Sequence, residues 1–294
     1  MVPHLIIIGG PTASGKTAVA VEAARLLKTE LVNADSRQVY KEMFIGTARP
    51  TEEELKGISC HLTGHRSIHT PYTTADFEQE ALNAISSLHK EHEHVVMAGG
   101  TGLYIQAICD GLDPMPDVPE TIREDIQHQL ETEGIESLQK ELLEKDPVYH
   151  AQVDLQNPRR LIRALEVCRA SGKPYSSFRK KTTTERPFRI TRIALLADRE
   201  ELYQRIDQRV NAMMEKGLLN EAESLFEYRT LPAVNTIGYR ELFLHLEGHC
   251  SLDEAVEKIK LNTRHYAKRQ MTWFRNDGRF TWMYADEVMQ RLES

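Results

Sequence analysis

The sequence has few of the features that mark secreted or membrane proteins. Its 294 residues include only four cysteines and no Cys-x-x-Cys pair, so neither a disulfide framework nor a zinc knuckle is expected. No apolar run approaches the ~18 residues of a membrane span. The apolar run Leu5–Ile8 follows no basic segment, which argues against a secretory signal. We therefore expect a cytoplasmic protein with no membrane anchor.

Charge is unevenly distributed along the chain. The formal net charge of −7 argues weakly against a nucleic-acid partner. Residues 113–154 hold 12 acidic and 3 basic side chains, whereas residues 156–192 hold 11 basic and 2 acidic ones. Residues 258–279 hold 7 basic side chains and 1 acidic one. Two basic segments can bind a polyanion whatever the total charge, although such segments also occur as solvated faces.

Short apolar runs alternate with helical patterns in the first third of the chain and once near its middle. Strands are expected at residues 4–9, 30–34, 94–98 and 188–197, and helices at 16–28 and 77–89. This alternation is typical of a parallel sheet with crossover helices.

A phosphate-binding loop follows the first expected strand and opens the first expected helix. Eight residues satisfy the pattern G-x-x-x-x-G-K-[ST]: Gly10, Pro11, Thr12, Ala13, Ser14, Gly15, Lys16 and Thr17. The glycines let backbone N–H groups face one anion, and the helix N-terminus adds positive potential. Lys16 is expected to neutralise phosphate oxygens, and the Thr17 hydroxyl to bind Mg²⁺.

These patterns predict an α/β fold with a P-loop NTPase-like core, in which helices flank a parallel sheet. Residues 1–112 and 187–294 are expected to form the core, with a helical part after Ala197. Residues 113–186 are expected to form a helical insertion domain. Two helices are expected to begin at Asp198 and Ser251, because a glutamate follows each of them three residues later.

One carboxylate is expected beside the phosphate-binding loop. Asp35 follows the second expected strand, and α/β proteins bind ligands at the carboxyl ends of parallel strands. The third expected strand ends in Gly99–Gly102, without the aspartate that an NTPase normally places there. Asp35 is therefore a candidate metal ligand or general base, and an N-cap of the following segment is the alternative.

A second group of polar residues has the spacing of metal ligands but not the local structure. Cys60, His61, His65 and His69 include histidines four residues apart, which would share one face of a helix. Gly64 and the weak helix propensity of this segment argue against a helix, so no metal site is expected there.

Six segments of the chain resemble the tRNA dimethylallyltransferases, also called tRNA isopentenyltransferases. They occur in the order of that family: Gly9–Thr17 (GGPTASGKT), Asp35–Pro50 (DSRQVYKEMFIGTARP), Gly99–Tyr104 (GGTGLY), Gln156–Arg163 (QNPRRLIR), Ile237–Glu241 (IGYRE) and Lys268–Arg275 (KRQMTWFR). The resemblance implies transfer of a dimethylallyl group from dimethylallyl diphosphate to the exocyclic N6 amine of the adenosine 3′-adjacent to a tRNA anticodon. The phosphate-binding loop would hold the donor's diphosphate rather than hydrolyse ATP, and no obligate protein partner is expected.

The resemblance also implies roles for individual residues. Asp35 would take a proton from the adenine amine, while Thr12 and Arg209 would stabilise the departing diphosphate. Arg209 lies at the edge of an apolar helix stripe and can reach inward, with a surface ion pair to Glu201 or Glu215 as the alternative. Contacts to the tRNA anticodon stem-loop are implied for Asp35, Ser36, Arg37, Gln38, Thr101, Arg123, Arg159, Arg160, Leu161, Ile162 and Arg163.

The last long helix is expected to carry a basic stripe. Lys260, Arg264, Lys268 and Arg275 recur at steps of 4, 4 and 7 and therefore share one face. Phosphate contacts of this kind would position an RNA without reading its sequence.

Three other functions are compatible with parts of this pattern. A prenyltransferase acting on free adenine nucleotides would need the phosphate-binding loop and Asp35 but not the basic helices. A small-molecule kinase would need ATP. A non-catalytic RNA-binding protein would not need Lys16, Thr17 and Asp35, so their presence counts against it.

Overall fold

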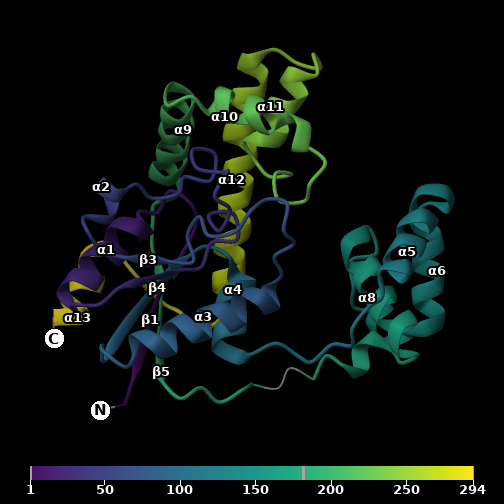
Figure 1. Ribbon diagram of the computed structural model, residues 1–294, viewed down its shortest axis with the longest axis horizontal. Coiled ribbons are helices and arrows are strands. Elements are labelled where there is room, and N and C mark those ends of the chain that lie inside the picture. Colours follow the sequence, from purple (N-terminus) through teal and green to yellow (C-terminus); the bar gives the residue numbers. More distant parts are fainter. Residues whose placement is uncertain (1, 181–182, 294) are drawn as a thin grey trace. The chain divides into compact units, whose positions relative to one another are not determined.

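A computed structural model describes residues 2–180 and 183–293, which belong to two compact units (Figure 1). The first unit comprises the chain up to Cys109 and from Glu185 onward, and the second comprises Asp110–Thr184. The sequence predicts the corresponding divisions after residues 112 and 186.

A parallel sheet forms the centre of the first unit. Within the described residues its strand order is β3-β2-β4-β1-β5-β6. The strands are β1 His4–Gly9, β2 Leu31–Asn33, β3 Cys60–His61, β4 His94–Gly99, β5 Arg189–Leu195 and β6 Thr281–Met283. Because β1 lies between β4 and β5, the phosphate-binding loop leaves the sheet near its middle. The predicted α/β fold is confirmed.

Alternating side chains along β1 determine which helices pack on each face of the sheet. Leu5 and Ile7 pack with residues of α3, α4 and α12, whereas Ile6 and Ile8 pack with residues of α1 and α13. A strand buried on both faces is expected to be continuously apolar, as β1 is. The helices of this unit are α1 Lys16–Leu26, α2 Glu52–Leu55, α3 Thr74–Leu88, α4 Gly102–Asp110, α9 Arg199–Glu215, α10 Leu218–Leu225, α11 Tyr239–Leu246, α12 Leu252–Asp277 and α13 Ala285–Glu293.

Two strands differ from the sequence-based prediction. The expectation that the chain is entirely helical after Ala197 is wrong, because β6 pairs in parallel with Ile193–Leu195 of β5. The two-residue strand β3 pairs with β2 and is not predicted either. Two or three residues are too few to show an alternating pattern, so only pairing with a neighbouring strand defines such elements.

Both predicted helix starts are confirmed. The side chain of Asp198 accepts hydrogen bonds from the backbone N–H groups of Glu200 and Glu201 at the start of α9. Ser251 and Glu254 form a reciprocal capping box at the start of α12. These caps satisfy N–H groups that have no partner within the helix itself.

The second unit is a small helical domain with its own apolar core. Its α-helices beyond the end of α4 are α5 Glu120–Glu133, α6 Ile135–Lys145, α7 Pro147–His150 and α8 Pro158–Ser171. Ile126, Leu138, Leu142, Leu161 and Leu165 are fully buried in this core. The acidic side chains of α5 and α6 lie outside this core, exposed or half-buried.

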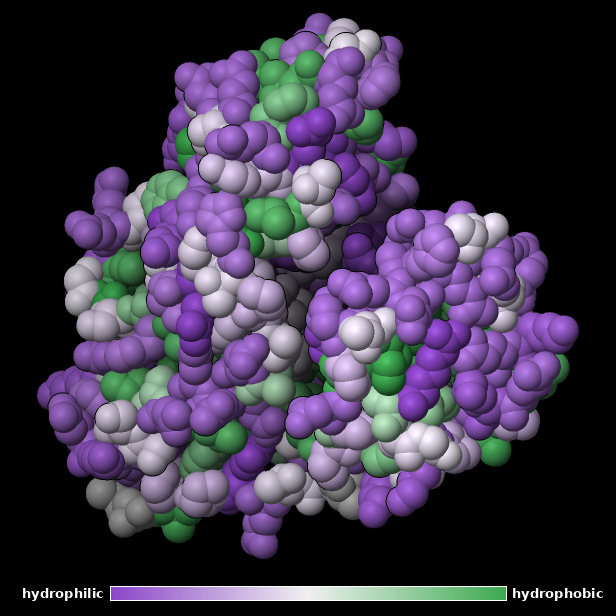
Figure 2. Space-filling view, turned by 45° about the vertical axis from the view of Figure 1, so that its right-hand side comes forward, coloured by the Kyte–Doolittle hydropathy of each residue, from purple (hydrophilic) through white to green (hydrophobic). Residues whose placement is uncertain are grey.

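Hydrophobic side chains on the face drawn in Figure 2 occur in small separate patches among hydrophilic ones. A surface of this kind is suited to a polar or charged partner rather than to a broad apolar contact. None of the helices in residues 2–180 and 183–293 combines the length and the apolar character needed to cross a bilayer.

Candidate active site

The phosphate-binding loop connects the buried strand β1 to helix α1. The loop needs unusual backbone conformations, because Gly10 has φ 140°, Gly15 has φ 87° and even Ala13 has φ 61°. Glycine adopts such values without the steric penalty of a side chain. The helix starts at Lys16 with no side-chain cap, so its first N–H groups remain available to an anion.

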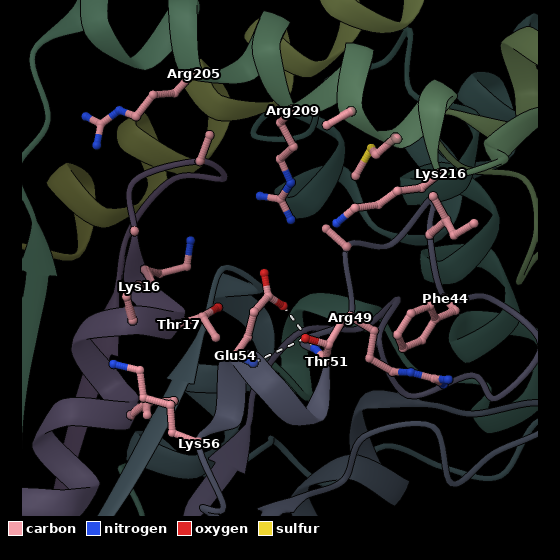
Figure 3. Close-up of a pocket in the computed structure, with 18 residues that line it drawn as sticks. Lys16, Thr17, Phe44, Arg49, Thr51, Glu54, Lys56, Arg205, Arg209 and Lys216 are labelled. Atoms are coloured by element: carbon pink, nitrogen blue, oxygen red, sulfur yellow. Dashed lines mark hydrogen bonds between the residues drawn. The ribbon is translucent and has the colours of Figure 1, made fainter.

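The half-buried cations Lys16 and Arg209 point into the space above this loop. Figure 3 shows Arg209 and Lys216 extending from one side of a cavity that Lys16 approaches from the other. Lys16 Nζ donates to the carbonyl oxygen of Pro11 at 2.5 Å, and Arg209 Nη1 donates to the Thr12 hydroxyl at 3.3 Å. Within the described residues neither Lys16 nor Arg209 forms an ion pair.

The environment of these cations is electrostatically unfavourable without a bound anion. Burial, and after it the nearby Arg209 guanidinium, lower the pKa of Lys16 from 10.5 to about 7, and only Asp35 opposes the change. Burial also lowers the pKa of Arg209, against the carboxylates of Asp35 and Glu54. A bound anion would favour the charged forms of both residues, so the site is suited to a diphosphate.

The Arg209 side chain points inward, as its position at the edge of the apolar stripe of α9 allows. Its guanidinium lies against the phosphate-binding loop, and it is Arg205 rather than Arg209 that pairs with Glu201, at 3.6 Å. Glu215, the other alternative partner, forms no ion pair in the described part of the chain.

Asp35 lies on a turn directly after β2. Its Oδ1 atom accepts from the backbone N–H groups of Arg37 at 2.8 Å and Gln38 at 3.4 Å. The local capping role that the sequence left open is therefore present. It engages one carboxylate oxygen, and within the described residues Oδ2 has no hydrogen bond.

A small cavity of about 80 Å³ brings the carboxylate and the cations together. Its lining includes Thr12, Lys16, Thr17, Asp35, Gln38, Arg209 and Gln270. A proton acceptor thus lies on the same cavity as two groups able to bind a leaving diphosphate. Thr17 and Asp35 supply the hydroxyl and carboxylate oxygens that Mg²⁺ prefers, and Mg²⁺ commonly combines one or two such protein ligands with substrate phosphates.

A larger cavity of about 680 Å³ shares the phosphate-binding loop and has one apolar wall. Phe44, Ile45 and Met213 belong to that wall, while the polar lining includes Arg49, Lys56, Arg205 and Lys216. Sequence reasoning missed these four cations. For the α9 side the signal was present, because residues 205, 209, 212, 213 and 216 recur at helical spacing.

Glu221 holds the apolar wall in place. Its carboxylate accepts from the backbone N–H groups of Phe44, Ile45 and Gly46 at 2.8–3.0 Å. The Tyr239 hydroxyl donates to the same carboxylate at 2.6 Å. The sequence gives no indication of this cluster, because its members are separated by up to about 195 residues of chain.

The residues expected beside Asp35 form a network within the protein. The Thr101 hydroxyl accepts from the Ser36 N–H at 2.9 Å, and the Gln38 amide donates to the carbonyl oxygens of Thr47 and Ala48. The Arg37 guanidinium donates to the carbonyl oxygens of residues 232 and 233 at 3.2 and 3.0 Å. This network fixes the turn that presents Asp35.

Comparison with known proteins identifies the family. The family model described as IPP transferase matches residues 38–277. tRNA dimethylallyltransferase 1 of Bacteroides thetaiotaomicron is 46% identical over 291 residues, which cover 99% of this chain and 94% of the relative. The tRNA dimethylallyltransferase of Christiangramia forsetii is 47% identical over 289 residues, covering 98% and 96%. The chain belongs to the tRNA dimethylallyltransferase family.

Solved structures of tRNA dimethylallyltransferases have the same fold. The full-length tRNA isopentenylpyrophosphate transferase from Bacillus halodurans superposes with a TM-score of 0.72 at 35% identity, covering 99% of this chain and 94% of that one. A eukaryotic dimethylallyltransferase acting on tRNA superposes with a TM-score of 0.80 at 28% identity, covering 96% and 74%. The resemblance drawn from the six sequence segments is therefore confirmed.

Within this tRNA dimethylallyltransferase homologue, the expected RNA contacts of the second unit differ in exposure. Arg159, Arg160 and Arg163 are exposed on α8, and Arg163 also pairs with Glu166 of the same helix at 3.1 Å. Arg123 is exposed as well and pairs with Glu120 at 2.9 Å.

Leu161 and Ile162 occupy a different environment from the arginines beside them. Leu161 is fully buried in the core of the second unit, and Ile162 packs partly buried against that core. An RNA contact by the Leu161 side chain would require this core to open. The implied contact is therefore better explained by the neighbouring arginines on the same turn of α8.

Half of the expected basic stripe on α12 is used inside the first unit. Arg264 forms an ion pair with Asp207 of α9, and Lys260 forms one with Glu257 of its own helix. Lys268 is exposed, and the Arg275 guanidinium lies over the Trp282 ring at 5.8 Å. The stripe thus combines helix packing with exposed charge.

The rejected histidine cluster has other partners. His61 lies 2.5 Å from Glu30, and His65 lies 2.9 Å from Glu80. Across the described residues, no group of three or more His, Cys, Asp or Glu side chains has the arrangement of a metal site.

Proposed function

We propose that this protein transfers a dimethylallyl group from dimethylallyl diphosphate to the N6 amine of the adenosine 3′-adjacent to a tRNA anticodon, in the cytoplasm. The observation that carries the proposal is one small cavity lined by Asp35, whose Oδ2 has no hydrogen bond in the described residues, and by the cations Lys16 and Arg209, which form no ion pair there. Membership of the tRNA dimethylallyltransferase family supports the choice of substrates.

The acceptor amine needs a base, because its lone pair is delocalised into the adenine ring. The amine nitrogen attacks C1 of the donor, the C1–O bond breaks, and the diphosphate leaves with the bonding electron pair. The Asp35 carboxylate takes the proton that the nitrogen loses. Positioned general bases typically contribute about 10²–10⁴-fold to such a step.

The leaving diphosphate gains negative charge as the C1–O bond breaks. The N–H groups at the start of α1, the Lys16 ammonium, the Thr12 hydroxyl and the Arg209 guanidinium line its expected position. Preorganised donors of this kind act most strongly where charge develops. Mg²⁺ held by the Thr17 hydroxyl would further neutralise the diphosphate.

The acceptor side requires an adenosine that leaves its stack. Extruding a base from a single-stranded loop costs less than extruding it from a duplex, which favours an anticodon stem-loop as substrate. The turn Asp35–Gln38 and Thr101 would contact the extruded base, while Arg123, Arg159, Arg160 and Arg163 would contact RNA phosphates. No obligate protein partner is part of this proposal.

A single assay tests the proposal against its alternatives. The protein is incubated with labelled dimethylallyl diphosphate, Mg²⁺ and either unmodified tRNA or AMP, without any nucleoside triphosphate. Label in tRNA, lost when the target adenosine is replaced by guanosine, supports the proposal. Transfer to AMP alone would indicate a free-nucleotide prenyltransferase. ATP-dependent ADP formation with a small acceptor would indicate a kinase, and RNA binding without any transfer would indicate a non-catalytic protein.

A further inference from the structure

Gln270 on α12 is one of the few buried polar side chains among the described residues, only 6% exposed. Both ends of its amide are engaged with the ligand-binding edge of the sheet. Oε1 accepts from the backbone N–H of Thr12 at 2.8 Å, and Nε2 donates to the carbonyl oxygen of Gly100 at 2.9 Å. One side chain thus joins the phosphate-binding loop to the loop that follows β4.

Helix α12 packs closely against these loops. A Cβ atom on Gly100 would overlap Gln270 Nε2, so only glycine leaves room for the amide. One turn further along α12, the ring of Phe274 occupies the space that a side chain at Gly9 would need. Side chains of the helix therefore pack directly against the backbone of both loops, and two hydrogen bonds hold the Gln270 amide between them.

Thr12 is held from two directions. Its N–H donates to Gln270 from α12, while its hydroxyl accepts from Arg209 of α9. An ion pair between Arg264 and Asp207 ties the two helices together. Because the Thr12 N–H is directed at Gln270, the backbone of Thr12 supplies no donor to an anion in this state, and its hydroxyl is the group left to face the cavity.

We propose that Gln270 is a positioning residue for the transfer reaction. By accepting from the Thr12 N–H, it sets the loop so that the Thr12 hydroxyl and the Arg209 guanidinium together meet the departing diphosphate. Gln270 touches neither substrate in this role and acts through Thr12. The expected effects on kinetics rest on the proposed function. The hydrogen bonds from which the role of Gln270 is inferred are independent of that function.

The first test replaces Gln270 by methionine, which keeps the length of the side chain and removes both hydrogen bonds. With dimethylallyl diphosphate and a tRNA transcript, we expect Gln270→Met to lower kcat about tenfold, since small misplacements of reacting groups are costly. The KM for tRNA should change less than about threefold. Gln290→Met, at an exposed position on α13, is the matched control and should leave kcat unchanged.

A double-mutant cycle separates positioning from a purely structural role. If Gln270 acts through the Thr12 hydroxyl, Gln270→Met should cost little once Thr12→Ala has removed that hydroxyl. The double variant should then be within about threefold of Thr12→Ala alone. Losses that multiply would overturn the proposal, because they would show that Gln270 contributes independently of Thr12. Unchanged kcat in Gln270→Met would overturn it as well.

Two further measurements keep the result decisive. The melting temperatures of all variants show whether a loss of kcat comes from unfolding. If Gln270→Met is unstable, Gln270→Asn replaces it. The asparagine side chain is too short to reach both partners and should cause the same loss of kcat. If the wild-type protein transfers no prenyl group, the proposed function fails. In that case the same double-mutant cycle is measured with the affinity for inorganic pyrophosphate as its readout. Additive effects of Gln270→Met and Thr12→Ala on that affinity would overturn the positioning role, independently of the proposed function.

Discussion

Two glycine-rich loops leave the sheet side by side, because Gly9 at the end of β1 is paired with Gly99 at the end of β4. The first loop needs glycine for its backbone. Gly15 has φ 87°, and outside its immediate chain neighbours nothing lies within 4 Å of where its Cβ would be. The second loop needs glycine for space, since a Cβ on Gly99 would overlap the backbone of Ala34 and one on Gly102 would overlap the Trp273 ring.

The difference matches what each loop does. The first loop leaves the N–H groups at the start of α1 without a side-chain cap and ends in Lys16, so we expect it to contact a ligand directly. The second loop acts on its neighbours, because Thr101 donates to the Ala34 carbonyl oxygen and accepts from the Ser36 N–H on either side of Asp35. Similar glycine content therefore fits the proposed ligand binding in one loop and the positioning of the candidate base in the other.

The largest expected effect comes from the first loop. Lys16→Ala should lower kcat/KM for dimethylallyl diphosphate by about 10²–10³-fold, because it removes a donor from developing negative charge. The affinity for tRNA, measured by filter binding, should stay within a few-fold of wild type. Lys90→Ala, at an exposed position, is the control. Loss of tRNA affinity without loss of donor use would contradict the assignment of this loop.

The second-largest effect is expected at Asp35, the residue that the second loop positions. Asp35→Asn keeps the shape of the side chain but removes the base, and we expect kcat to fall by about 10²-fold or more. Pyrophosphate should still bind, since Lys16 and the loop N–H groups are intact. Near-normal single-turnover rates in this variant would show that another group accepts the proton.

The packing role of the second loop predicts a specific rescue. Gly102→Ala should destabilise the protein by about 1–3 kcal/mol through overpacking against Trp273. Combining it with Trp273→Leu should recover part of that loss in urea unfolding, relative to Trp273→Leu alone. For Gly15→Ala no neighbouring side chain can be trimmed, because its cost lies in the backbone conformation. Equal rescue of both glycine variants would remove the distinction between the loops.

Substitutions of the arginines on α8 should weaken tRNA binding without affecting the function of either loop. Replacing Arg159, Arg160 and Arg163 together by alanine should weaken tRNA binding about tenfold and flatten its salt dependence, because fewer counterions are released. The KM for dimethylallyl diphosphate should hardly change. An unchanged salt slope would assign these arginines to an ordinary solvated face.

The smallest expected effect is a dependence of the protein's stability on pH, caused by the titration of Lys16 in the first loop. Lys16 has a folded-state pKa of about 7 against 10.5 in its ordinary state, so the folded protein holds fewer protons between these values. The cost of burying the charge is therefore complete below pH 7 and fades as the pH rises toward 10.5. Lys16→Met should melt above wild type at pH 6, and the difference should shrink by at least about 2 °C at pH 9. A difference that is independent of pH would exclude a buried charged Lys16.

Much of the first loop could be predicted from the sequence because its signals are local. The strand, the glycines and the Lys-Thr pair lie within residues 4–17, and the observed β1 and α1 start at the expected residues. The place of Asp35 at a strand end also follows from a short segment. Local patterns succeed here because backbone conformation and helix start depend on neighbouring residues.

The positions of the other helices and strands could be predicted only in part. Both capped helices begin where expected, but β6 does not show in the sequence, because its three residues become a strand only by pairing with β5. The tRNA roles implied for the arginines of α8 and for Arg123 remain predictions, as does the Mg²⁺ ligand Thr17.

The sequence by itself indicated the phosphate-binding loop, the candidate base and the family, because each is encoded in short runs of residues, one run for the loop, one for Asp35 and six for the family. Only the tertiary structure decided that Gly99–Gly102 is a packing surface, that Arg209 reaches Thr12, and that Gln270 holds Thr12 from 258 residues away. These contacts depend on how closely α9 and α12 approach the sheet. Such distances result from the packing of many side chains at once, which no local pattern records.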